Sequence, residues 1–391
     1  MSRLLRTAAG TALGCLLALS AAAPAHAATP RGWEAKAMGL DAARSASQGQ
    51  GAGITVAVLD TGVIPDHPAL KGRVADVGPD YIEDGHRPGD PQWGNHGTAM
   101  ASDVLKVAPR AKILSVRVIS DDASDDEDAD EDHIRDRNAK AKRTSIAKGI
   151  DYALQHGADV ISMSLGGDAN LLSRYETSEV DALGRAAQKG VPVLASAGNG
   201  GDEDNDGNYP AGYPSVMAIA ATDKDGTRAP FSTVRSYVAL AAPGISIPSA
   251  KNTGGYKPVN GTSPAAALTS GVVALMLSTN GDLTPAQVRT TLTQTAHHPS
   301  GGRNDLVGHG VVNAAAAVKT AANPPTAQAG PLAHHGEEHF AAPNGTTRTK
   351  GMPVHTEDVV ATTVAVLLGA GVLTIGILVI RRSRRPALPG A

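Results

Sequence analysis

The sequence predicts an α/β fold of three layers, in which a mostly parallel β-sheet carries helices on both faces. Five runs of β-branched and apolar residues lack polar alternation, as strands buried on both faces do: 54–59, 113–119, 159–165, 191–197 and 216–221. Segments with helical apolar spacing lie between or after them: 144–156, 179–189, 264–277 and 285–293. This alternation of strands and helices favours a parallel sheet.

The first strand, 54–59, ends at Asp60-Thr61-Gly62. A carboxylate at the carboxyl end of a parallel strand stands where α/β proteins place their functional sites. Asp-Thr-Gly also occurs in aspartic proteases, but their mechanism needs two carboxylates that share one site, and this chain has one copy. Asp60 is therefore predicted to serve a different chemistry.

Two further motifs place reactive side chains at helix starts. In 94–101, His96 stands among small residues that let an imidazole occupy a crowded point and begin a helix. In 259–268, Ser263 follows Gly-Thr and opens an alanine-rich run, so its hydroxyl is expected at a helix N-terminus, with Pro264 at the first helical position. Each motif alone is commonplace, since such a serine is usually a helix cap and a lone histidine is usually structural.

A fourth motif, 195–200, ends a buried strand in a glycine-rich turn that carries Asn199, whose amide can donate to an oxyanion. With Asp60, His96 and Ser263 in that order, the chain resembles the subtilisin-like serine proteases, the subtilases of peptidase family S8. The resemblance runs from about residue 33 to 320. It includes the segments 107–112, 162–167, 209–214, 241–244 and 308–314.

The resemblance implies a role for each residue. Ser263 would be the nucleophile, His96 the general base and then acid, and Asp60 the group that orients His96. The Asn199 amide and the Ser263 backbone N–H would form the oxyanion hole, and no cofactor is required for catalysis.

The resemblance also implies that Ser164, Leu165 and Gly166 pair with an extended substrate backbone. One departure stands close to the nucleophile. The family usually has a proline four residues after the serine, whereas here Pro264 comes at once and Ala267 takes the later place.

A charged insert at 121–143 has nine acidic residues between 121 and 132, followed by a basic stretch. Like-charge blocks are usually solvated, and that interpretation stands beside a second one. In a subtilase this connection borders the cleft, so the acids could select basic substrates or gate the cleft.

Asp202, Asp204, Asp206 and Gly207 form a D-x-D-x-D-G run directly after the asparagine motif. Alternating carboxylates can hold Ca²⁺, but the bidentate Glu expected at position twelve is replaced by Tyr213. The run is thus either a structural Ca²⁺ site or a solvated acidic loop.

The ends of the chain predict export and membrane attachment. Basic residues, an apolar run and Ala25-His26-Ala27 give 1–27 the form of a secretory signal, which contains the only cysteine, Cys15. An extension, 28–53, precedes the catalytic domain, 54–320.

Beyond the domain lie a Pro-rich linker, 321–358, an uncharged run, 359–380, long enough to cross a bilayer, and a basic tail, 381–391. The arginines of the tail predict a single-pass type I protein with a cytoplasmic C-terminus. His335-Gly336-Glu337-Glu338-His339 matches a zinc-protease string, but that motif needs a helix, and this one lies in a Pro-rich segment whose sequence offers no apolar face.

The leading hypothesis is a serine endopeptidase at the outer face of the cytoplasmic membrane, acting on protein or peptide substrates. The short extension, linker and anchor also resemble the mycosins, membrane-anchored subtilases of type VII secretion systems, although this chain lacks their usual disulfides. The alternative is a structural or processing component of such a complex, with proteolysis secondary. A net charge of −3 gives no indication of nucleic-acid binding.

Overall fold

The computed structural model describes residues 30–47, 49–121, 144–168, 176–203 and 205–327, together with Gly371 and Thr374. A seven-stranded parallel sheet forms its centre, with strand order β2-β3-β1-β4-β6-β8-β9. The strands are β1 (Thr55–Asp60), β2 (Val74–Asp80), β3 (Lys112–Arg117), β4 (Val160–Met163), β6 (Val193–Ser196), β8 (Val216–Thr222) and β9 (Val238–Pro243). The predicted parallel sheet is confirmed.

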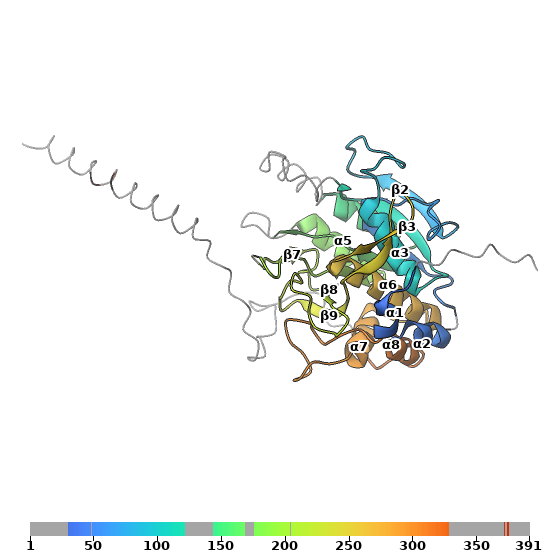
Figure 1. Ribbon diagram of the computed structural model, residues 1–391, viewed down its shortest axis with the longest axis vertical. Coiled ribbons are helices and arrows are strands. Elements are labelled where there is room, and N and C mark those ends of the chain that lie inside the picture. The colour runs from blue at the N-terminus through green and yellow to red at the C-terminus, as the bar shows by residue number, and fades with distance from the viewer. Residues whose placement is uncertain are drawn as a thin grey trace, which may run out of the picture.

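The helices cover both faces of the sheet, so the predicted three-layer arrangement is confirmed (Figure 1). The described helices are α1 (Trp33–Ala37), α2 (Leu40–Ala46), α3 (Asn95–Val107), a helix at 144–155, α5 (Thr177–Gln188), α6 (Thr262–Thr279), α7 (Pro285–Thr295) and α8 (Ala314–Ala321). Short antiparallel pairs join β10 (Ile247–Ala250) to β11 (Tyr256–Val259), and β5 (Gly167–Asp168) to β7 (Asn208–Tyr209).

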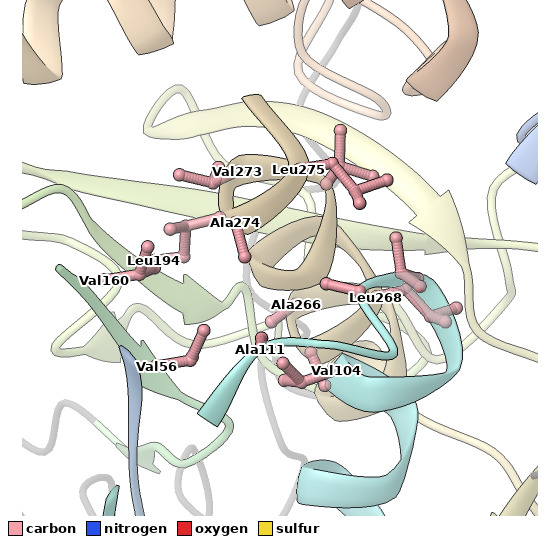
Figure 2. Packing of buried hydrophobic residues seen from close by; sticks show 14 of the residues in the cluster. Val56, Val104, Ala111, Val160, Leu194, Ala266, Leu268, Val273, Ala274 and Leu275 are labelled. Atoms are coloured by element: carbon pink, nitrogen blue, oxygen red, sulfur yellow. The ribbon is translucent and has the colours of Figure 1, made fainter. Parts of the chain in front are cut away.

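Alternate residues of β1 enter two separate cores. Val56 and Val58 pack with α3 and α6 on one face, whereas Ala57 and Leu59 pack with α5 and the helix at 144–155 on the other. Figure 2 shows Val56 of β1, Val160 of β4 and Leu194 of β6 on the face of the sheet that α6 covers. A strand buried on both faces needs apolar residues at every position, which is why 54–59 shows no alternation.

The sequence pattern missed β2 and β9. Strand β2 lies at the edge of the sheet, and its residues are exposed or half-buried, so they carry no continuous apolar run. Strand β9 is fully buried at the other edge but is built largely of alanine, which has weak strand propensity.

The predicted extension, 28–53, contributes α1 and α2 to the domain. Met38, Leu40 and Ala43 belong to the same core as α6 and α8. Figure 1 shows α1, α2, α7 and α8 gathered at one side of the sheet. The extension therefore packs as part of the catalytic domain in the structure.

Among the described residues, one helix is long and apolar enough to cross a membrane, α6. Because 89% of its apolar window is buried, α6 is the central core helix of the domain. The predicted membrane span, 359–380, lies outside the described residues except for Gly371 and Thr374, and the signal at 1–27 lies wholly outside them.

Candidate active site

The predicted site residues meet at the carboxyl edge of the sheet. Asp60 ends β1, Ser164 directly follows β4, and Asn199 follows β6. The register pairs Val58 with Ser162, so Asp60 and Ser164 lie at the same level of neighbouring strands. Helices α3 and α6, which pack against each other, both begin at this edge.

His96 is held against Asp60. Its Nδ1 donates to Asp60 Oδ1 at 2.8 Å, and the Thr61 backbone N–H donates to the same oxygen at 2.7 Å. The Asp60 side chain is 1% exposed, whereas that of His96 is 32% exposed, so the ring keeps an edge toward solvent. A Cβ at residue 97 would lie 2.0 Å from the Gly62 carbonyl oxygen, which explains the glycine after His96.

Opposing effects act on the protonation of His96. Burial by itself lowers the pKa of the imidazole, but the charge of Asp60, its hydrogen bond and the charge of Asp121 raise it. The positive charge of Lys257 lowers this pKa. The net result is a pKa above the ordinary histidine value, because the two carboxylates favour the imidazolium.

Helix α6 begins two residues earlier than predicted. Gly261 is its N-cap and Thr262 its first residue, so Ser263 is second and Pro264 third. The Asn199 Oδ1 atom accepts hydrogen bonds from both the N–H and the hydroxyl of Thr262, each at 2.9 Å, and this extends the helix. The prediction of Pro264 at the first position is therefore wrong, yet the proline still lies in the first turn, where no intrahelical N–H bond is lost.

Two N–H donors face one small space beside Gly261. A Cβ on this glycine would lie 3.6 Å from Asn199 Nδ2 and 3.6 Å from the Ser263 backbone N. The side-chain oxygen of Asn199 already accepts hydrogen bonds from Thr262, and this orientation turns the amide nitrogen toward the space. Such convergent donors can stabilise an oxyanion.

The hydroxyl of Ser263 lies against the strand end that was predicted to bind substrate. Its Oγ donates to the Ser164 carbonyl oxygen at 3.2 Å, and Ser164 Oγ donates to the Ser263 carbonyl oxygen at 3.0 Å. Leu165 turns its side chain into the core, and its carbonyl oxygen accepts from Ser196 Oγ. Beside Gly166 stands the Asn208 amide, 2.0 Å from where a Cβ would be.

A small cavity of about 90 Å³ adjoins Asn199 and reaches Glu203 and Asp206 of the acidic loop, the D-x-D-x-D-G run that follows this asparagine. It is lined by Gly198, Asn199, Gly200, Glu203, Asn205, Asp206, Asn208 and Thr233. Asparagine amides and carboxylates dominate this lining, so the cavity is polar.

Two of the three predicted Ca²⁺ ligands in the acidic loop, Asp202 and Asp206, lie within the described residues. Asp206 lies 3.9 Å from Arg235, and the charge of Asp202 acts on Arg228. Asp204 lies outside the described residues. Within the described ranges, no group of three or more His, Cys, Asp or Glu side chains is arranged to hold a metal, and the Ca²⁺ site stays a prediction.

One residue of the site was assigned by sequence to the charged insert. Asp121 accepts hydrogen bonds from the backbone N–H groups of Asn95 and His96, at 2.7 and 3.0 Å. Burial raises the pKa of Asp121, against the lowering effect of these hydrogen bonds. No local pattern could single it out among the acids that follow it, and residues 122–143 lie outside the described residues.

A family model described as "Subtilase family" matches residues 51–310. Subtilisin DY from Bacillus licheniformis is 34% identical over 281 residues, which cover 69% of this chain and 92% of the subtilisin. The crystal structure of MycP1 from Mycobacterium smegmatis aligns with a TM-score of 0.64 at 26% identity, over 82% of this chain and 91% of MycP1. The MycP3 protease from the type VII (ESX-3) secretion system aligns with a TM-score of 0.62 at 30% identity, over 75% and 90% of the two chains.

Proposed function

This chain belongs to the subtilase family of serine endopeptidases, and we propose that it cleaves peptide bonds with Ser263, His96 and Asp60, outside the cell and attached to the membrane. The observation that carries the proposal is the Asp60–His96 hydrogen bond at the same sheet edge as Ser263 and the paired donors beside Gly261. Base, nucleophile and oxyanion donors are the parts that acyl transfer requires.

The reaction begins when the Ser263 hydroxyl leaves the Ser164 carbonyl and donates to the Nε2 atom of His96. As Oγ attacks the substrate carbonyl, His96 takes the proton, and Asp60 stabilises the imidazolium. The oxyanion enters the space beside Gly261, between Asn199 Nδ2 and the Ser263 N–H. His96 then protonates the leaving amine, and water hydrolyses the acyl-enzyme by the reverse sequence of transfers.

Export and attachment are supported by the two ends of the sequence. The signal at 1–27 directs the chain out of the cell, and the apolar run at 359–380 with its basic tail anchors it in the cytoplasmic membrane. The catalytic domain then stands on a Pro-rich tether on the outer side of that membrane.

Labelling with a fluorophosphonate tests the catalytic assignment. The full chain in membranes should incorporate the label, and Ser263→Ala should abolish it. Ser270→Ala is a matched control, because Ser270 lies on the same helix but is buried against Ser162, and labelling of this variant should persist. Equal labelling of the wild type and Ser263→Ala would exclude Ser263 as the nucleophile.

A second role, as a structural component of a secretion complex, is supported by the similarity to MycP1 and MycP3. MycP3 is described as a protease from the type VII (ESX-3) secretion system. Comparing Ser263→Ala with complete deletion separates the two roles. Normal secretion in the point variant and lost secretion in the deletion would make the structural role primary, whereas equal defects would make proteolysis primary.

The acidic loop is proposed to hold a structural Ca²⁺ through Asp202, Asp204 and Asp206. Calorimetric titration of the metal-free protein should detect binding, and Ca²⁺ should raise the melting temperature. The Asp202→Asn/Asp206→Asn variant should lose both effects. Absence of heat and of a thermal shift in the wild type would show that the loop is only solvated.

A further inference from the structure

Helix α3 begins without a local cap. Its N-cap is Gly94, which has no side chain, so the first N–H groups of the helix need partners from elsewhere. The Gly94 N–H donates to the Thr61 carbonyl oxygen at 3.1 Å, and the Gly97 N–H donates to Thr61 Oγ1 at 3.0 Å. The two N–H groups between them, of Asn95 and His96, both donate to Asp121.

Asp121 reaches α3 because of how the chain leaves the sheet. Strand β3 pairs in parallel with β1, with Arg117 opposite Asp60. The Val118 N–H then donates to the Asp60 carbonyl oxygen at 2.8 Å, which keeps the chain beside the end of β1. Four residues after Arg117, the carboxylate of Asp121 meets the start of α3, and Thr61 hydrogen-bonds to it as well.

His96 is thus held by two carboxylates in different ways. Asp60 accepts from the ring, whereas Asp121 accepts from the backbone N–H of the same residue. A negative charge at a helix N-terminus is also favoured by the helix dipole. We propose that Asp121 is a positioning residue for His96, whose carboxylate fixes the start of α3 and whose negative charge supports the imidazolium formed during catalysis.

The inference rests on the proposed function, in which His96 is the general base. Within the part of the chain that the structure describes, the charged groups that face His96 come from three elements: Asp60 on β1, Asp121 after β3, and Lys257 on β11, whose Nζ donates to Asn95 Oδ1 at 3.3 Å. The two carboxylates raise the pKa of His96 more than the single ammonium group lowers it. Removal of the Asp121 charge leaves one negative and one positive group beside the imidazole. The imidazolium should then lose its proton at a lower pH.

The pH dependence of fluorophosphonate labelling tests this assignment with the full chain. Asp121→Asn keeps an amide oxygen that can accept one N–H but removes the charge, so the acid limb of the rate should move to lower pH by roughly half a unit. The rate on the plateau should fall by no more than about threefold, because a base whose pKa is half a unit lower is weaker by at most that factor. Asp121→Ala should show the same shift and a lower plateau.

Asp159→Asn provides the matched control. Asp159 is also half-buried and accepts from a backbone N–H, that of Thr55 at 2.7 Å, but it stands at the opposite end of β1 from Asp60. The acid limb of the labelling curve for Asp159→Asn should superimpose on that of the wild type. Superposition of the Asp121→Asn curve on the wild type, or an equal shift in both asparagine variants, would overturn the proposal.

A readout without turnover separates this inference from the proposed function. The His96 imidazole is titrated by NMR in the Ser263→Ala protein, with and without Asp121→Asn, and its signal is assigned by its loss in His96→Gln. The midpoint of the His96 titration should fall by roughly half a pH unit in the protein that also carries Asp121→Asn. If labelling fails in the wild type but the midpoint moves, the positioning role stands and the protease proposal fails. An unmoved midpoint refutes the role even in an active enzyme.

Discussion

The Nδ1 atom of His96 lies 2.8 Å from Oδ1 of Asp60, although the residues stand 36 positions apart in the chain. This bond leaves the other ring nitrogen, Nε2, available for the proposed proton transfer from Ser263. Burial lowers the pKa of His96, but Asp60 and Asp121 raise it above 6.5 overall. A general base must be neutral, so labelling of Ser263 should increase with pH and reach its midpoint above pH 6.5. A midpoint clearly below pH 6.5 would show that Asp60 and Asp121 do not raise the pKa of His96 above its ordinary value.

Replacement of Asp60 by Asn should leave the fold intact but remove the charge that stabilises the imidazolium. An asparagine can also present its NH₂ group to Nδ1 and favour the wrong tautomer of His96. We expect the rate of peptide hydrolysis to fall by about 10⁴, as for this change in a Ser-His-Asp triad. Steady-state kinetics, with circular dichroism as the check on folding, measure the loss. A fall of less than tenfold would mean that Asp60 does not orient the base.

Asn199→Ala should lower kcat by roughly 10²–10³, with little change in KM, because its Nδ2 donates to the oxyanion only as charge develops. The variant also loses the hydrogen bonds from Thr262, so its melting temperature must be measured beside its kinetics. Asn199→Asp separates the effects, since it keeps the acceptor for Thr262 but lacks the amide donor. Comparable activity of Asn199→Asp and the wild type would remove the side chain from the oxyanion hole.

Gly261→Ala should abolish hydrolysis, because its methyl group would occupy the space between Asn199 Nδ2 and the Ser263 N–H. The backbone of Gly261 has φ 150°, so the substitution also strains the chain. Gly254→Ala controls for strain, since Gly254 has φ 94° and nothing within 4 Å of the added Cβ. We expect this control to lose some stability and retain activity. Activity in Gly261→Ala would show that the space is not used.

Asp103 belongs to a buried charge cluster that joins α3 to the N-terminal segment. Lys106 Nζ lies 3.1 Å from Asp103 Oδ1 and 3.3 Å from Glu34 Oε1, with all three side chains 0% exposed. Burial raises the pKa of Asp103 to about 6, although Lys106 and Ser249 act to lower it. The folded state thus holds this proton more tightly than the unfolded chain, whose Asp titrates near 3.8.

The stabilisation from protonated Asp103 is complete below about pH 4 and is lost as the pH rises to about 6. The wild type should therefore lose stability relative to Asp103→Asn over this window, on the order of 2 kcal/mol. Urea unfolding of both proteins at pH 4 and pH 7 measures the difference, with exposed Asp282→Asn as the control. A difference that is the same at both pH values would show that Asp103 keeps its ordinary pKa in the fold.

The strongest sequence signals came from local constraints. Continuous apolar runs identified the buried strands, since each strand faces a core on both sides. The glycines on either side of His96 were visible because close backbone contacts exclude any side chain there, as the Gly62–Gly97 approach shows. Gly261 is instead required by its backbone conformation, with φ 150°. The carboxyl ends of parallel strands meet at one edge, so Asp60 and Asn199 could be expected to lie near each other.

The sequence by itself determined five buried strands of the sheet, the helices between and after them, the family resemblance and the identity of the four candidate catalytic residues. Only the tertiary structure decided that α6 begins at Thr262, that Gly261 leaves a space shared by two donors, and that Asp121 caps α3. The physical reason is distance along the chain. A hydrogen bond between residues 25 or 63 positions apart depends on how the strands are registered, and no local pattern records that register.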